Sequence, residues 1–138
     1  RMNRLSERLL TVFLKGPQMW QQVPDTVRET LVGNAAALGT LGEIIKYVDN
    51  NPEADTEELL VRWSDESSYP ELLRRAQQPL EIAAQALQGE FVEGMGRLCE
   101  NVLSEQRRQV LTTLRQDPSA DEFRRYWQLH GVDQGDAK

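Results

Sequence analysis

The residue types that most often do chemistry in proteins are scarce in this chain. His130 is the only histidine and Cys99 the only cysteine among 138 residues. The chain therefore lacks the residues needed for a catalytic triad built on histidine, for a zinc site with several histidines or cysteines, or for an intrachain disulfide. Cys99 also falls within an apolar helical stripe, where a cysteine is usually a packing residue, and a lone cysteine fits a reducing compartment.

Two other patterns could carry chemistry, and both are better explained as ordinary structure. Gly89, Gly94 and Gly96 lack the preceding strand, the spacing and the lysine of a phosphate-binding loop. Glu57 and Glu58 are adjacent, and adjacent helical positions point in different directions, so they predict a solvated acidic face rather than an acid–base pair or a Mg²⁺ site. We therefore expect a binding module that is not an enzyme, with no cofactor and no metal in this domain.

The charge of the chain is unevenly spread. The net charge is −6, and residues 43–71 hold nine acidic and two basic residues, which argues against binding to nucleic acid. Residues 1–15 hold four basic residues and one acidic residue, so this start either receives a small acidic ligand such as a peptide tail or is a solvated helix face. No run approaches the roughly 18 apolar residues of a membrane span, and we expect a soluble, cytoplasmic protein.

The elements that must position any binding surface are all helical, because no alternating run of β-branched and aromatic residues indicates a strand. Apolar residues at helical spacing predict helices over about 3–15, from Asp25 to Gly33, and through Leu38 to Val48. Asp55 followed by Glu58, and Ser68 followed by Glu71, are capping-box patterns that predict two more helix starts. Pro79 is expected to open a helix over 80–88 that either continues into the next one or kinks at its end.

The last third of the chain carries the most informative pattern. An apolar stripe begins at Phe91 and ends at Leu103, the face becomes polar over 104–109, and a smaller stripe resumes at Val110. The sequence Asp-Pro-Ser at 117–119 then ends the helix, and a short aromatic helix follows. We therefore predict an all-α fold: a compact helical bundle over 1–104, then a long helix leading into a terminal helical hairpin over 105–138 that serves for partner docking.

The order of these features resembles the carboxy-terminal, helicase-binding domain of bacterial replicative primases of the DnaG type. The resemblance covers nearly the whole chain, and its strength lies in order and spacing rather than in a catalytic signature. The segments that carry it are Arg8-Leu9-Leu10 leading to Gly16-Pro17, Leu38-Gly39 with Glu43-Ile44-Ile45, Asn51-Pro52, Thr56 with Glu58-Leu59-Leu60, Leu72, Phe91, Glu105-Gln106-Arg107, and Leu129 near Trp127.

The resemblance implies two protein partners. The first is the replicative DNA helicase, whose amino-terminal domains would receive the hairpin through Val110, Leu114, Phe123, Tyr126, Trp127, Leu129 and His130. The second is the acidic carboxy-terminal tail of single-stranded-DNA-binding protein, for which the candidate residues are Arg4, Arg8, Thr11 and Lys15. Arg8 matches a basic position of that site, whereas Arg4 supplies charge nearby without mapping cleanly.

The resemblance also has departures and alternatives. The run from Arg8 to Pro17 is one residue shorter than the family pattern, and after His130 the chain has a single lysine, Lys138, where family members carry several. Zinc binding and nucleotide polymerisation would belong to the amino-terminal parts of the primase.

The main alternative is the amino-terminal helical domain of the helicase itself, which assembles into rings, whereas a primase domain is expected to be a monomer alone. A small helical enzyme or a DNA-binding protein is a third class.

Overall fold

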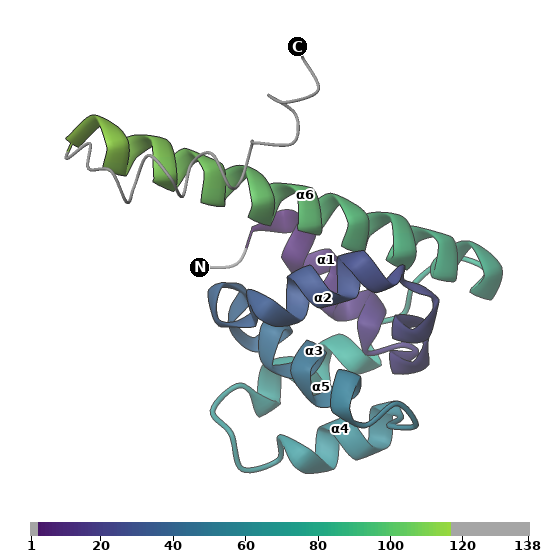
Figure 1. The fold of residues 1–138 in the computed structure, drawn as a ribbon. Coiled ribbons are helices and arrows are strands. Elements are labelled where there is room, and N and C mark those ends of the chain that lie inside the picture. Colours follow the sequence, from purple (N-terminus) through teal and green to yellow (C-terminus); the bar gives the residue numbers. More distant parts are fainter. Residues whose placement is uncertain (1–2, 117–138) are drawn as a thin grey trace. The chain divides into compact units, whose positions relative to one another are not determined.

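The computed structural model describes residues 3–116, and this part of the chain is all-α, as predicted, with no strand. Figure 1 labels the α-helices along the chain. The elements are α1 (Arg4–Phe13), the 3₁₀ helix η1 (Pro17–Gln22), α2 (Asp25–Gly33), the 3₁₀ helix η2 (Ala35–Leu38), α3 (Gly39–Asn50), α4 (Thr56–Arg62), α5 (Tyr69–Gln77) and α6 (Ala84–Gln116).

Helix α1 forms where the sequence predicts it and is buried along most of its length. The side-chain oxygen of Asn3 accepts a hydrogen bond of 2.8 Å from the backbone N–H of Ser6, which satisfies one of the free donors at the helix start. The helix ends at Phe13, two residues before the predicted end. The ring of Phe13 then packs against Trp20 and Phe91, with ring centroids 6.1 Å and 5.0 Å apart.

The core of the bundle receives side chains from η1, from all five helices α1 to α5 and from the first part of α6. Its largest fully buried side chains are Trp20, Phe13, Phe91, Leu9, Leu10, Leu14, Leu31, Leu41, Ile44, Ile45, Leu59 and Leu72. At 25 cal/mol per Å², each such side chain contributes about 1.5–3 kcal/mol relative to an exposed one. The core is therefore contributed by helices from both ends of the described chain.

A tight connection joins η2 to α3. Gly39 has a φ of 61°, a backbone conformation that suits glycine. Three residues later, a Cβ atom on Gly42 would lie 1.9 Å from the backbone carbonyl oxygen of Ala35. The start of α3 can therefore approach η2 this closely only because residue 42 has no side chain.

The two capping-box predictions have different outcomes. At α4, the Asp55 carboxylate accepts a hydrogen bond of 2.8 Å from the backbone N–H of Glu58, which confirms the predicted cap. At α5 the helix begins after Ser68, as predicted, but Ser68 makes no side-chain capping bond, so the predicted capping box itself is wrong. The carboxylate of Glu71, which would complete that box, is instead bound by the guanidinium groups of Arg74 and Arg75.

The prediction that Pro79 opens a helix is also wrong. Residues 78–83 are not helical, and α6 begins at Ala84. From there α6 runs for 33 residues to Gln116 and passes through Gly89 and through 104–109 without interruption. At 1.5 Å per residue it is about 50 Å long.

Burial along α6 changes partway. The residues that are buried are Phe91, Gly94, Met95, Leu98 and Cys99, and none of the described residues after Cys99 is buried. The chain groups into two compact units, Arg1–Cys99 and Glu100–Lys138. The first part of α6 thus belongs to the bundle, where a Cβ on Gly94 would lie 2.6 Å from Cδ2 of Leu9 on α1.

Candidate interaction surfaces

The four candidate residues for an acidic tail follow one side of α1 and its extension. Arg4, Arg8, Thr11 and Lys15 are spaced by four, three and four residues, which is the spacing of neighbours on a helix surface. Arg4 and Arg8 are exposed, Lys15 is half-buried, and Thr11 is buried. Two guanidinium groups are therefore the part of this set that faces solvent.

Arg8 is bound by a carboxylate from α6. Its Nε donates to Oε2 of Glu90 at 2.5 Å, and its Nη2 donates to Oε1 of the same carboxylate at 3.0 Å. Two parallel charge-assisted bonds of this kind fix both side chains in one plane. The hydrogen bond to Arg8 holds the pKa of Glu90 below its ordinary value, and the same bond raises the pKa of Arg8.

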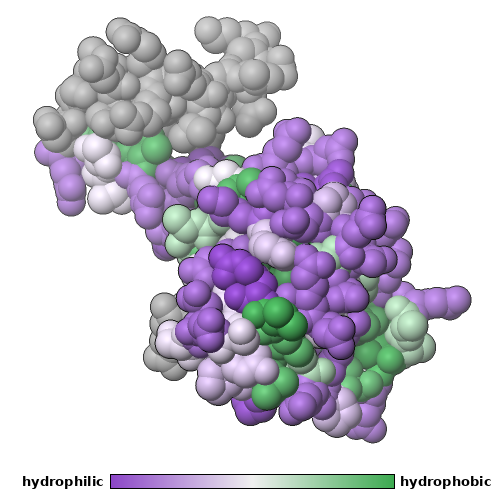
Figure 2. Space-filling view, turned by 90° about the horizontal axis from the view of Figure 1, so that it is seen from below, coloured by the Kyte–Doolittle hydropathy of each residue, from purple (hydrophilic) through white to green (hydrophobic). Residues whose placement is uncertain are grey.

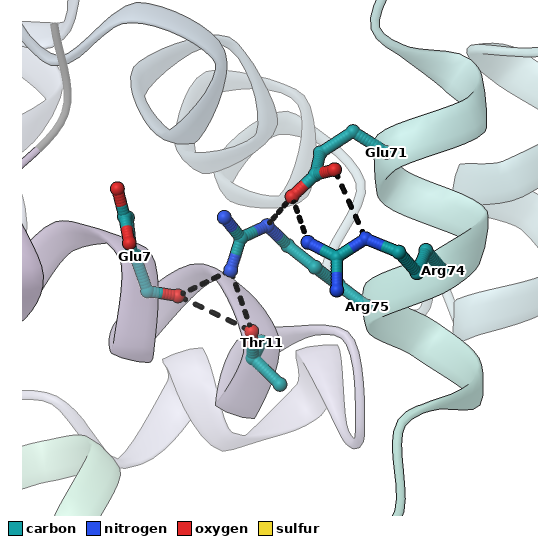
Figure 3. A network of polar contacts seen from close by, with 5 residues as sticks. All are labelled: Glu7, Thr11, Glu71, Arg74 and Arg75. Atoms are coloured by element: carbon teal, nitrogen blue, oxygen red, sulfur yellow. Dashed lines mark hydrogen bonds and ion pairs between the residues drawn. The ribbon is translucent and has the colours of Figure 1, made fainter.

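Thr11 belongs to a polar network between α1 and α5 that is centred on Arg75, as Figure 3 shows. The Nη1 group of Arg75 donates to Oγ1 of Thr11 at 3.0 Å and to the backbone oxygen of Glu7 at 3.2 Å. The Nε atom of Arg75 lies 2.8 Å from the carboxylate of Glu71. Arg74 also donates to Glu71, and this hydrogen bond is the main cause that lowers the pKa of the Glu71 carboxyl.

Lys15 binds the end of α5. Its ammonium donates to the backbone oxygen of Ala76 at 2.7 Å and to that of Gln78. These carbonyls lie at the carboxy-terminal end of α5, where a positive charge is favoured by the helix dipole and by the unpaired carbonyl groups. Lys15 therefore links α1 to α5, and its ammonium is already occupied by protein groups.

The structure thus brings the predicted residues onto one side of α1 and gives three of them partners that the sequence analysis did not include. Glu90 and Arg75 lie 82 and 64 residues from the groups that they bind. Local spacing cannot pair residues at such separations. One feature of the sequence could have indicated the Arg8–Glu90 pair. Glu90 directly precedes Phe91, the first residue of the apolar stripe that packs against α1.

The candidate helicase-binding residues fall mostly beyond the described part of the chain. Val110 and Leu114 lie four residues apart on α6, and both are half-buried. The other five, Phe123, Tyr126, Trp127, Leu129 and His130, lie outside the described residues. The assignment of all seven to a docking surface stays a prediction.

A second surface feature is a polar cleft of about 460 Å³ beside the ends of α3 and α4. Tyr47 and Trp63 meet there edge to face, with ring centroids 5.6 Å apart, and the guanidinium carbon of Arg62 lies 5.0 Å from the Trp63 ring. Tyr47 donates a 2.6 Å hydrogen bond to Glu58, which raises the pKa of the tyrosine. The cleft carries charges of both signs, and nothing in its lining selects a ligand.

The described residues offer little else that suggests a ligand or a membrane. The face seen in Figure 2 is mostly hydrophilic with separate apolar patches. Among the large apolar side chains of the described residues, Val61 is exposed, at 68%. Within residues 3–116 no three or more His, Cys, Asp or Glu side chains are placed to hold a metal ion. No helix in this range has the length and apolar character needed to cross a membrane.

Comparison with known proteins adds one finding. A family model described as DNA primase DnaG DnaB-binding matches residues 7–129, from within α1 to beyond the end of α6. No curated protein and no solved structure matched the chain. The family match spans most of the 138 residues and includes α1 from residue 7 onward and the whole of α6. The chain belongs to the DNA primase DnaG DnaB-binding family, a family of helicase-binding interaction domains rather than catalytic ones.

Proposed function

We propose that this chain is the domain by which a bacterial replicative primase docks on the amino-terminal domains of the replicative helicase ring. The observation that carries this proposal is the family match over residues 7–129. The domain acts as a tether: it raises the local concentration of the polymerising part of the primase where the helicase opens duplex. Primer synthesis is thereby coupled to the movement of the replication fork.

We place the docking surface in the second unit, which begins at Glu100. The half-buried residues Val110, Leu111 and Leu114 form a short apolar stripe beyond the polar segment 104–109. Tyr126 and Trp127 are the large aromatic residues near this stripe in the sequence, and such residues often dominate the binding energy of an interface. The contact is therefore proposed to centre on this stripe and these two rings.

The test is a pulldown against purified replicative helicase with the full chain and with a variant that lacks residues 105–138. The full chain is expected to bind and the shortened one to lose binding while it keeps its helical circular dichroism signal. Single variants Tyr126→Ala and Trp127→Ala then locate the contact, and at least one is expected to weaken binding by about 2 kcal/mol or more. Full binding by the shortened chain would place the docking surface on the bundle instead.

The alternative, an amino-terminal domain of the helicase itself, finds no support, because the matched family is that of the primase domain. The two differ in assembly state. We propose that the chain is a monomer alone, and size-exclusion chromatography with light scattering measures this directly. A ring-sized mass would favour the helicase reading.

We also propose a second partner, the acidic carboxy-terminal tail of single-stranded-DNA-binding protein, at the α1 surface. Two exposed guanidinium groups one turn apart, Arg4 and Arg8, favour an anionic ligand there. Calorimetry with a tail peptide is expected to show micromolar binding that fades between about 50 and 300 mM salt, because the Debye length, about 10 Å at 0.1 M, shortens across this range and exposed charges are increasingly screened. If Arg8→Ala binds the peptide as tightly as the wild type, the site is wrong.

A further inference from the structure

The place on α1 that best fits a carboxylate is already filled from within the chain. Arg8 presents its Nε and Nη2 groups as a fork, and Glu90 takes both at 2.5 Å and 3.0 Å. A free carboxylate from another molecule would bind the same fork in the same geometry, because the planar guanidinium edge matches two carboxylate oxygens. Two carboxylates cannot occupy that edge together.

Arg8, Thr11 and Lys15 each bind another part of the chain. Of these described contacts, the Arg8–Glu90 pair is the one that an outside group can displace without disturbing the fold. The side chains of Arg8 and Glu90 are 45% and 32% exposed. By contrast, Thr11 is 4% exposed and bonded to Arg75, and Lys15 holds backbone oxygens at the end of α5. Breaking those contacts would leave buried polar groups unpaired, which costs more than exchanging one exposed ion pair for another.

We propose that Glu90 is an internal competitor for the anion site at Arg8: an acidic ligand binds by replacing the Glu90 carboxylate with its own and releases Glu90 from α1. This inference rests on the proposed anion-binding role of α1. Glu90 lowers the affinity of the site and restricts it to ligands that present a carboxylate in the plane of the guanidinium. An anion that is weakly acidic, or too bulky to place two oxygens against Nε and Nη2 of Arg8, does not displace Glu90.

The chain offers a matched control for the test. Glu93 lies on the same helix, is exposed, and has no hydrogen bond or ion pair within the described residues. Glu90→Gln and Glu93→Gln each remove one negative charge from α6, but only the first removes the carboxylate that Arg8 binds. Both should remain folded, since neither side chain is buried, and thermal melting checks this.

The experiment is calorimetric titration of the wild type and three variants with a synthetic Asp-Asp-Asp-Phe peptide that has a free carboxylate. An exposed ion pair is worth up to about 1 kcal/mol, so Glu90→Gln is expected to bind about three- to fivefold more tightly than the wild type. Glu93→Gln is expected to bind less than about twofold more tightly, because exposed charges interact weakly through water. Arg8→Ala should lose most of the binding.

The outcomes separate the inference from the function on which it rests. If Arg8→Ala loses binding but Glu90→Gln is no tighter than Glu93→Gln, the anion site stands and the competitor role is refuted. If Arg8→Ala binds like the wild type, the anion site itself is refuted and Glu90 competes for nothing. An NMR spectrum of the arginine Nε–H groups adds a direct readout, since the Arg8 signal should move on Glu90→Gln and stay in place on Glu93→Gln.

Discussion

Two glycines on α6 allow the energetic effect of the close contact between α6 and α1 to be measured by alanine substitution. Gly94 and Gly96 are two residues apart in the same helix, and an alanine at either one gains about 1 kcal/mol of helix propensity. Their surroundings differ. A Cβ at Gly94 would lie 2.6 Å from Cδ2 of Leu9, which is 1% exposed, whereas a Cβ at Gly96 would meet nothing within 4 Å.

The structure therefore predicts that only one of the two substitutions stabilises the chain. Gly96→Ala should raise the free energy of unfolding by about 1 kcal/mol. Gly94→Ala gains the same propensity but forces Leu9 or the helix to shift, and overpacking of this kind costs about 1–3 kcal/mol. Gly94→Ala is thus expected to be about 0–2 kcal/mol less stable than the wild type, and about 1–3 kcal/mol less stable than Gly96→Ala.

Urea denaturation followed by circular dichroism measures both changes, and equal slopes would show that the unfolded state is unaffected. The comparison has a functional side, because Glu90 lies four residues before Gly94 and Leu9 follows Arg8. A shift of α6 away from Leu9 should therefore also loosen the Arg8–Glu90 pair. If both alanine variants were stabilised to the same degree, Leu9 would have room to move and the close approach of the two helices would not be a constraint.

Three further predictions follow from other contacts. Gly42→Ala should destabilise the bundle by about 3 kcal/mol or more, because its Cβ would lie 1.9 Å from a backbone oxygen that a side-chain rotation cannot move; a large drop in melting temperature checks this. The hydrogen-bonded ion pair with Arg8 lowers the pKa of Glu90 from 4.5. The stability that this pair adds is therefore present above pH 4.5 and is lost as the pH falls through the lowered pKa. The difference in free energy of unfolding between the wild type and Glu90→Gln should accordingly vanish on acidification. Amides of 109–116, where no residue is buried, should exchange with solvent faster than those of 41–48, and equal protection in hydrogen exchange would contradict this.

The helices could be predicted because their signals are local. Apolar spacing placed α1, α2 and α3 within a few residues of their observed bounds, and Asp55 caps α4 as its pattern indicates. The errors arose where a distant or competing partner decided the outcome. Glu71 has the spacing of a capping residue, but its carboxylate is bound by two arginines on the next turn of the same helix.

The candidate site could be predicted only in part, for the same physical reason. Helical spacing is enough to place Arg8, Thr11 and Lys15 on one side of α1. Which of them remains available to a ligand depends on groups that the fold brings from 61 to 82 residues away. An isolated sequence pattern gives the positions of charges but not their partners, and here the partners decide that Arg8 rather than Lys15 is the exchangeable group.

The packing of α1 against both α5 and α6 also has a consequence for how the chain is made. Its buried face includes Phe13, which packs against the nearby ring of Trp20 but meets its second partner ring only when Phe91 has been synthesised. At about 5–20 residues per second, a ribosome needs roughly 4–16 seconds to add the intervening stretch. During that interval the apolar face of α1 is covered only in part, first by Trp20 of η1 and later by α5. The helix that begins the described fold is thus among the last elements to complete its packing, and part of its apolar surface stays open to aggregation until α6 emerges.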